Sequence, residues 1–470
     1  MNTTSAMKQE FFSIDESKRK KIIRQDRIFV DSESHKFVIN EKIFNVDNYS
    51  PFGLSLKNFD LIGDSFNGVY LFEGIQICDL KLTLVRVVKT DSSNTSGFII
   101  EGMPLPVESL NALSLVIKTI HNFEGNQLKF KNVPMNFKTE TQLFKSWIQA
   151  IETEINLLQK TNFDLPGKAL ADYEEAICQY VSMYLMVNVQ TYCEKIAATT
   201  FGLDSALVKN CYDYLRSMVG EVFYKSPYGN RAYSKPRGYA GDYEMMNNVY
   251  YNELRGHTLF GKSLQRYFTD NPAGKAVRNR AIYLNEKIKQ ALAGKESIKI
   301  LGVASGPARE IQKLFEDYPE LAAKCEIHLL DQDTEALKFS QRDILEICRA
   351  KKVKPNIQFH NLAIKDIINE GLPMDGFDLI YSAGLFDYFT DPVAQFAAIK
   401  LHQSLKSGGK LIIGNFNTNN PAQFIMEAIG DWYLIYRDEK QLTQLFSKVT
   451  PKLHIEKESE NVNLFAVMEK

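Results

Sequence analysis

Residues 298–309 read IKILGVASGPAR, and this stretch decides the fold expected for the C-terminal part of the chain. An apolar run over residues 298–303 is followed by the small residues Ala304, Ser305 and Gly306, after which a helical pattern begins. The pattern predicts a buried strand, a tight turn and a helix. Small side chains in the turn let a ligand approach the backbone amides, which favour electron-rich groups.

Further strand-like runs follow this turn. They read EIHLLD, NIQFHN, FDLIYS and GGKLIIGNF, and helical patterns separate them. Such alternation predicts a doubly wound parallel α/β sheet. Asp331 ends the first of these runs, 25 positions after Gly306, close to where a ribose-binding acid falls in a nucleotide-binding unit. Because the turn lacks G-x-G-x-x-G, it favours S-adenosylmethionine over a dinucleotide.

The composition is that of a soluble globular protein. The 470 residues are 44% hydrophobic and 24% charged, which fits a chain of about three domains. The formal net charge is -1, so we expect no nucleic acid partner. The six cysteines form no CxxC pair, which predicts no metal site and fits a reducing compartment. Without a signal core or a run of about 18 apolar residues, we expect a cytoplasmic location and no transmembrane segment.

The pattern changes twice along the chain. Short β-rich runs from about residue 28 to residue 88 predict a small antiparallel barrel or sandwich. Helical patterns follow, and the α/β alternation comes last. We therefore expect a multidomain α+β protein with a small β-barrel domain over residues 1–125, a central helical region over 126–275 and a doubly wound Rossmann-like domain over 276–470.

One expected helix of the central region carries an apolar stripe. It consists of Phe144, Ile148, Ile151, Ile155 and Leu158, at steps of four and three. The spacing predicts an amphipathic helix with a coiled-coil-like seam. The stripe either forms a homodimer interface or packs on the chain's own next helices, and the second alternative is favoured.

A stretch rich in Gly, Pro and Tyr, KSPYGNRAYSKPRGYAGDYEMM, interrupts the helical patterns over residues 225–246. We expect an irregular segment, and loops that keep many aromatic residues usually bind a ligand. The stretch predicts a cap over a mostly apolar substrate with one polar end, in which Arg237 binds substrate and Tyr239, Asp242 and Tyr243 are catalytic. The alternative is a purely structural Gly-Asp turn.

Two further groups are candidate binding residues. Arg278 and Arg280 precede the first α/β strand and are able to reach a carboxylate of cofactor or substrate. The alternative is a solvated helix face. Trp432, Tyr436 and Arg437 follow the last clear strand and are expected to line the acceptor pocket, although aromatic residues at helical spacing are more often part of a core.

The motifs ILGVASGPARE, HLLDQD, FDLIYSAGLFDYF and SGGKLIIGNF resemble the successive strand-end motifs of class I S-adenosylmethionine-dependent methyltransferases. The resemblance implies a Rossmann-like methyltransferase domain with S-adenosylmethionine as cofactor. Gly302 and Leu362 depart from it, since acidic residues are common at both positions. The cofactor-binding residues that the pattern and the resemblance imply are Arg278, Arg280, Ala304, Ser305, Gly306, Asp331, Gln332, Asn361, Leu362 and Ser382.

The motifs KPRGYAGDYEMMN, AVRNR and NPAQFIMEAIGDWYLIYR narrow the resemblance to bacterial methyltransferases of extracellular-factor 3-hydroxypalmitic acid methyl ester biosynthesis. This resemblance implies O-methylation of the carboxylate of a small or fatty hydroxy acid. Such a carboxylate is already ionised at neutral pH. An alcohol or amine acceptor would instead require a general base, for which Asp387 and Asp242 are candidates.

Near the N-terminus, Arg24 and Arg27 precede the motif NYSPFG. The two elements resemble the RxxxR and D/NxSxxG motifs with which PilZ domains bind cyclic di-GMP, although the arginines here are spaced RxxR. The resemblance implies a nucleotide effector site formed by Arg24, Arg27, Asn48, Ser50 and Gly53, since arginines pair with phosphates and stack on guanine. The alternative functions are a barrel used only for contact, and a cyclic di-GMP-responsive signalling module whose methyltransferase fold is a degenerate scaffold.

Overall fold

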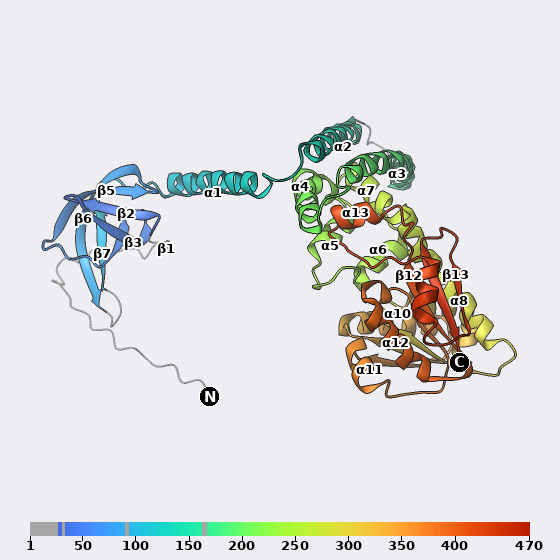
Figure 1. Cartoon of the computed structure of the whole chain (residues 1–470). Coiled ribbons are helices and arrows are strands. Elements are labelled where there is room, and N and C mark those ends of the chain that lie inside the picture. The colour runs from blue at the N-terminus through green and yellow to red at the C-terminus, as the bar shows by residue number, and fades with distance from the viewer. Residues whose placement is uncertain (1–26, 31–32, 90–93, 162–166) are drawn as a thin grey trace. The chain divides into compact units, whose positions relative to one another are not determined.

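The computed structural model describes residues 27–30, 33–89, 94–161 and 167–470 (Figure 1). The chain forms two compact units, residues 1–129 and residues 130–470. The second unit contains both the helical patterns and the α/β alternation expected from the sequence. Arg24, one of the expected effector residues, lies outside the described residues.

The N-terminal unit is built around a closed antiparallel barrel, as the β-rich runs predicted. Neighbouring strands follow the order β3-β2-β5-β6-β7-β4, and β3 also pairs with β4, which closes the barrel. Alternate residues such as Phe37, Val46 and Leu82 are buried in its core. The strands are β1 (Ile28–Phe29), β2 (His35–Ile39), β3 (Lys42–Ser50), β4 (Gly53–Lys57), β5 (Ser65–Phe72), β6 (Ile75–Lys89) and β7 (Asn94–Glu101), and helix α1 (Val107–Lys129) follows.

The second unit begins with a group of helices around one apolar core. They are α2 (Met135–Thr161), α3 (Gly167–Ala198), α4 (Ser205–Phe223), α5 (Pro227–Ser234), α6 (Tyr243–Tyr251), α7 (Leu259–Asp270) and α8 (Pro272–Leu292). In the stripe on α2, Phe144 and Ile148 are fully buried in this core, and Ile151 and Ile155 pack against it. Packing on the chain's own helices thus accounts for most of the stripe, and the homodimer stays a prediction.

The expectation of an irregular segment over residues 225–246 was wrong in part. Helix α5 and the start of α6 lie within it, so only residues 225–226 and 235–242 remain without helix. The Ser226 hydroxyl accepts from the Gly229 amide, and Pro227 occupies the first helical turn. Asp242 caps α6 in the same way, accepting from the Met245 amide. Both caps satisfy amides that a helix leaves without partners at its start.

The α/β part is a seven-stranded sheet with the order β10-β9-β8-β11-β12-β14-β13. The neighbouring pairs from β10 to β12 are parallel, whereas β14 runs antiparallel to both β12 and β13. Its strands are β8 (Ile298–Val303), β9 (Cys325–Asp331), β10 (Asn356–Asn361), β11 (Phe377–Ser382), β12 (Leu405–Phe416), β13 (Leu453–Lys457) and β14 (Asn463–Glu469). The strand order reverses between β8 and β11, and ligands of such sheets bind at the carboxyl ends beside this point.

Helices cover both faces of the sheet, which confirms the doubly wound expectation. Apolar residues of α8, α9 and α10 pack with one face, and residues of α11, α12 and α14 pack with the other. The bounds of these helices and of α13 are α9 (Arg309–Asp317), α10 (Thr334–Lys351), α11 (Ile364–Glu370), α12 (Asp391–Gln403), α13 (Gln423–Ala428) and α14 (Glu439–Phe446). A search of the described ranges finds no helix long and apolar enough to span a membrane.

Candidate active site

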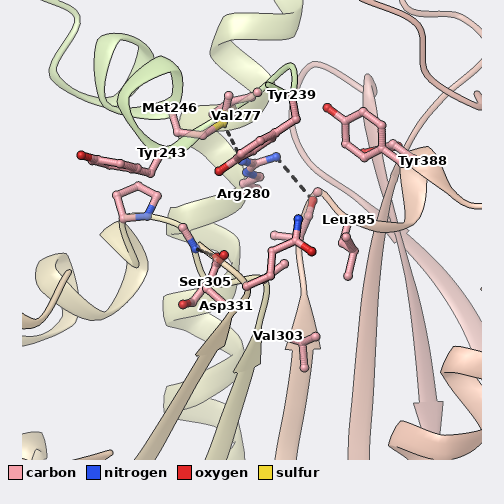
Figure 2. A pocket seen from close by; sticks show the side chains of 18 of the residues that line it. Tyr239, Tyr243, Met246, Val277, Arg280, Val303, Ser305, Asp331, Leu385 and Tyr388 are labelled. Atoms are coloured by element: carbon pink, nitrogen blue, oxygen red, sulfur yellow. Dashed lines mark hydrogen bonds between the residues drawn. The ribbon is translucent and has the colours of Figure 1, made fainter. Parts of the chain in front are cut away.

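A cavity of about 340 Å³ lies at the carboxyl ends of β8, β9 and β11. Figure 2 shows side chains that meet there from the residue 235–242 segment, from helices α6 and α8, and from the strand ends. The expected site residues that line it are Tyr239, Tyr243, Arg280, Ala304, Ser305, Gly306, Asp331, Gln332, Leu362 and Trp432. The structure thus brings together residues from six separate parts of the sequence.

The turn after β8 has an unusual backbone. Ala304, Gly306 and Ala308 have φ angles of 51°, 53° and 50°, in the left-handed region that residues with a side chain seldom adopt. Such strain is most often found at functional sites. A Cβ added at Gly306 would have no neighbour within 4 Å. The turn therefore leaves room for a ligand close to its backbone.

Asp331, at the end of β9, is tied to this turn. Its carboxylate accepts from the Gly306 amide at 2.8 Å and from the Asp333 amide at 2.9 Å. Burial raises the pKa of Asp331, although its backbone hydrogen bonds act in the opposite direction. Each carboxylate oxygen can accept a second hydrogen bond, so the fixed carboxylate still has acceptor capacity for a ligand hydroxyl.

The segment 235–242 is fastened over the cavity. Arg237 donates two hydrogen bonds to the Asp333 carboxylate, at 2.7 and 2.6 Å, and the Tyr239 hydroxyl donates a third at 2.8 Å. The Arg237 guanidinium also lies 5.2 Å from the ring centre of Tyr243. Burial would raise the pKa of Asp333, but the hydrogen bonds from Arg237 and Tyr239 lower it to about 2. We call residues 235–242 the cap.

Several expected site residues lie outside the cavity lining. The buried Asp242 carboxylate accepts from Arg231 at 2.9 Å as well as capping α6. Arg278 donates to Asp270 at 2.8 Å, and Asn361 donates to the backbone carbonyls of Asp331 and Gln332. The side chains of the first two therefore stabilise helices, and that of Asn361 holds the loop after β9.

The other residues outside the lining are Ser382, Tyr436, Arg437 and Arg237. Ser382 is buried in β11. Arg437 is buried and donates to Asp391 and to the carbonyls of Phe386 and Phe389. These contacts hold the segment after β11 in place, which is a structural role for the Arg437 side chain.

Two oppositely charged side chains are buried at the cavity without an ion pair. Arg280 donates to the Tyr250 hydroxyl at 3.3 Å, to the Ala383 carbonyl at 3.4 Å and to the Met246 sulfur at 3.1 Å. Glu310, from the first turn of α9, accepts from the Tyr381 hydroxyl at 2.7 Å. Within the described residues, neither group has an oppositely charged side-chain atom within 4.0 Å. Burial raises the pKa of Glu310.

The far side of the cavity is mostly apolar and contains one carboxylic acid. Asp387 is 2% exposed and accepts from the Phe416 amide at 2.6 Å. Burial raises its pKa to about 7, against the effects of that hydrogen bond and of Arg280 and Arg437. Trp432 donates to the Tyr388 hydroxyl at 2.8 Å, and Tyr388 donates to the Ala240 carbonyl. This side of the cavity can hold an apolar molecule near a group that gains or loses a proton close to neutral pH.

Sequence reasoning missed Met246, Tyr250, Glu310, Tyr381 and Tyr388, which also line the cavity. Two of them carried a usable signal. Glu310 lies in the first turn of helix α9, directly after the loop of small residues that follows β8. Tyr388 comes shortly after the carboxyl end of the parallel strand β11, where ligands of such sheets bind. The others come from helices and a buried strand, where a local pattern gives no sign of a site.

The expected effector residues that the structure describes, Arg27, Asn48, Ser50 and Gly53, also lie together. Arg27 donates to the Asn48 side chain at 2.6 Å, and a Cβ added at Gly53 would lie 3.0 Å from Arg27 Nη2 and 3.1 Å from Ser50 Oγ. Burial and the positive charge of Arg86 lower the pKa of Arg27. Two guanidinium groups therefore approach each other beside the NYSPFG motif.

The cavity, its turn and the strand order define a Rossmann-like ligand-binding domain, and comparison with known families agrees. Residues 294–461 match the family described as "Methyltransferase domain". The match supports the expectation of a methyltransferase domain in this part of the chain. A comparison with curated protein sequences finds no significant match.

Solved structures similar to the chain include methyltransferases. A possible exported protein from Bordetella parapertussis is 18% identical with a TM-score of 0.41, over 49% of this chain and 79% of that one. The N-methyltransferase NodS from Bradyrhizobium japonicum is 16% identical with a TM-score of 0.31, over 48% and 97%. Magnesium protoporphyrin IX methyltransferase from Synechocystis is 11% identical with a TM-score of 0.32, over 42% and 87%.

Proposed function

We propose that residues 130–470 transfer a methyl group from S-adenosylmethionine to the carboxylate of a small or fatty hydroxy acid. The observation that carries the proposal is one cavity that joins the Gly306 turn and Asp331 to a chamber walled by Leu385, Phe416 and Trp432. A polar end with nucleotide-type contacts and an adjoining apolar end suit a cofactor and an apolar acceptor side by side.

In this proposal each end of the cavity has its own task. The Asp331 carboxylate accepts from the ribose hydroxyls, the amides of the turn contact the amino acid part of the cofactor, and Leu362 packs on adenine. When bound, the cofactor supplies a methyl group on a sulfonium. The cap, fastened by Arg237 and Tyr239, excludes water. The chain's main contribution is then to hold an acceptor oxygen in line with that methyl group.

The acceptor determines what Asp387 does. A carboxylate oxygen forms a bond to the methyl carbon as the carbon–sulfur bond breaks, so an ester forms and no proton is released. Protonated Asp387 would donate a hydrogen bond to such an acceptor, whereas ionised Asp387 would repel it. A hydroxyl acceptor would instead lose its proton to ionised Asp387. With a pKa of about 7, turnover of a carboxylate should fall above neutral pH, and turnover of a hydroxyl should rise.

The test is a methyl-transfer assay on the full-length protein. The protein is incubated with S-adenosylmethionine labelled in the methyl group and with 3-hydroxy fatty acids of graded chain length, and the labelled methyl ester is measured by mass spectrometry between pH 6 and pH 9. Asp331→Ala should abolish product, whereas Asp317→Ala, an exposed residue of α9, should not. If the wild type binds S-adenosylhomocysteine but methylates none of these acids, the acceptor assignment is wrong. If it binds no S-adenosylhomocysteine, the degenerate signalling scaffold is the better reading.

We also propose that the barrel is PilZ-like and binds cyclic di-GMP. Arg86 supports this proposal, because it supplies a second described arginine beside Arg27. In the strand register Asn48 lies opposite Ser55, Ser55 opposite Gly97, and Gly97 opposite Arg86. A Cβ at Gly97 would lie 2.9 Å from Arg86 Cγ, so the missing side chain lets Arg86 lie across β7.

Titration calorimetry with cyclic di-GMP tests the effector site. Arg27→Ala and Arg86→Ala should each weaken binding at least tenfold, since each removes a charge-assisted contact to phosphate. Lys42→Ala, an exposed cation on the same barrel, is the control. Absence of binding by the wild type would leave the barrel as a contact domain. Addition of the nucleotide to the methyl-transfer assay then tests whether it regulates turnover.

A further inference from the structure

Helix α3 carries apolar side chains on the side that faces solvent. Tyr180, Met183, Tyr184 and Val187 have the spacing that places residues on one side of a helix. Their exposed fractions are 75%, 57%, 41% and 68%. The opposite side of α3 is buried in the apolar core of the second unit, so this helix is apolar on both sides. We call these four residues the α3 face.

The α3 face lies in a stretch of the chain that has no charged residue. Residues 176–193 contain no Asp, Glu, Lys, Arg or His, although 24% of the residues of the whole chain are charged. A surface helix normally turns charged residues toward water. A contiguous apolar patch on a protein surface marks an interaction site in many proteins. The pattern therefore indicates that another apolar surface covers the α3 face.

The patch continues onto helix α2 and is large enough for a stable interface. The Trp147 ring lies 6.1 Å from the ring of Tyr184, and Leu143, one turn before Trp147, is 54% exposed. At about 200 Å² for a fully exposed side chain of this size, the α3 face alone offers roughly 500 Å². A stable dimer buries about 800 Å² on each copy. Leu143 and the polar residues at the edges of the face supply the remaining area.

We propose that the α3 face binds the same face of a second copy of this chain, with the two α3 helices antiparallel and Tyr180 opposite the partner's Val187. The face is distinct from the stripe on α2, in which Phe144 and Ile148 are buried within the chain's own core. The proposal goes beyond the proposed function, since it depends on neither the cofactor nor the acceptor.

The charges at the two ends of the stretch favour a second copy as the partner and the antiparallel direction. Asp172 precedes the stretch and Lys195 follows it, and both are exposed. In a parallel pair each of these residues would come to the level of its own like charge. In an antiparallel pair centred between residues 183 and 184, Asp172 comes to the level of the partner's Lys195, and the uncharged centre meets itself. Interfaces in which opposite charges approach each other are favoured over those in which like charges do.

Sedimentation velocity of the full-length protein tests this pairing. The wild type should sediment as a dimer at micromolar concentration. Tyr180→Glu buries a charge against the partner's Val187, and Val187→Lys does the same at the partner's Tyr180. Each substitution should weaken dimerisation at least 100-fold, because an unpaired charge is costly to bury. Circular dichroism should stay unchanged, since both side chains are exposed in the single chain.

Mixing the two variants tests the register. A mixed pair has one contact between glutamate and lysine and one wild-type contact between tyrosine and valine, so the dimer should return. The matched control is a mixture of Tyr180→Glu with Val187→Glu, in which two like charges meet and the chains should stay monomeric. A dimer that neither single substitution weakens, or a mixture of oppositely charged variants that stays monomeric, would overturn the proposal. A monomeric wild type would also overturn it and leave a membrane surface or a different protein as the occupant of the face.

Discussion

Replacing the buried Asp387 with asparagine should make the second unit more stable, and by an amount that grows with pH. Asp387→Asn keeps an oxygen that can accept from the Phe416 amide but removes the charge. The pKa of Asp387 is raised to about 7 from an ordinary value of 3.8, so the folded state holds its proton up to neutral pH, whereas the unfolded state releases it near pH 4. The stabilisation of the protonated acid is therefore complete below pH 4 and is lost as the pH rises through 7.

The magnitude follows from the difference between the two pKa values. One pKa unit corresponds to about 1.36 kcal/mol, so complete ionisation of folded Asp387 costs about 4 kcal/mol. Part of this cost already applies at pH 5. We therefore expect the difference in free energy of unfolding between Asp387→Asn and the wild type to grow by about 2.5 kcal/mol from pH 5 to pH 8.

Urea denaturation followed by tryptophan fluorescence measures this gain. The sequence contains 2 tryptophans, Trp147 and Trp432, and both belong to the second unit, so the signal reports that unit alone. Asp375→Asn, an exposed acid of the same unit, is the control and should show no such trend. A gap between Asp387→Asn and wild type that stays constant from pH 5 to pH 8 would refute the reasoning, because it would mean that folded Asp387 titrates at an ordinary pKa.

Three further substitutions probe the cavity and its surroundings. Gly306→Ala places a methyl group in the open space of the cavity and should weaken S-adenosylhomocysteine at least tenfold, whereas Gly294→Ala, at an exposed glycine with a positive φ of 76° and open space around an added Cβ, should only lower stability by about 1 kcal/mol. Arg237→Gln removes the two guanidinium hydrogen bonds to Asp333, the aspartate that anchors the cap, so hydrogen exchange across residues 235–242 should become faster. Gly302→Ala forces a Cβ to 2.8 Å from a buried tyrosine hydroxyl, and urea denaturation should reveal a loss of about 1–3 kcal/mol.

The sequence predicted those features that depend on local patterns. Strands β8 to β12 are short apolar runs with turns between them, and the place of Asp331 follows from its distance to Gly306 along a βαβ unit. The N-cap residue of helix α6 also had a local signal, since Asp242 directly precedes a helical pattern. We assigned it to catalysis instead, and its carboxylate faces Arg231 and the helix rather than the cavity.

What the sequence did not reveal depends on partners far away along the chain. Arg237 meets its partner Asp333 at a separation of 96 residues, and Glu310 meets Tyr381 at a separation of 71 residues. Neither pairing follows from spacing, because each requires the packing of helices on the sheet. The buried state of Asp387 has the same origin. Its place after β11 was readable as a site position, but its pKa depends on how tightly the surrounding segments close.

The position of β14 inside the sheet has a consequence for the order in which the chain can fold during synthesis. Strand β12 pairs with β14 through residues 410–416, and β13 pairs only with β14 among the described strands. Until residues 463–469 leave the ribosome, β12 has one open hydrogen-bonding edge and β13 has no partner. Open edges of this kind favour association between chains. A ribosome that stalls before residue 463 would therefore release an aggregation-prone fragment, even though every residue that lines the cavity had already been made.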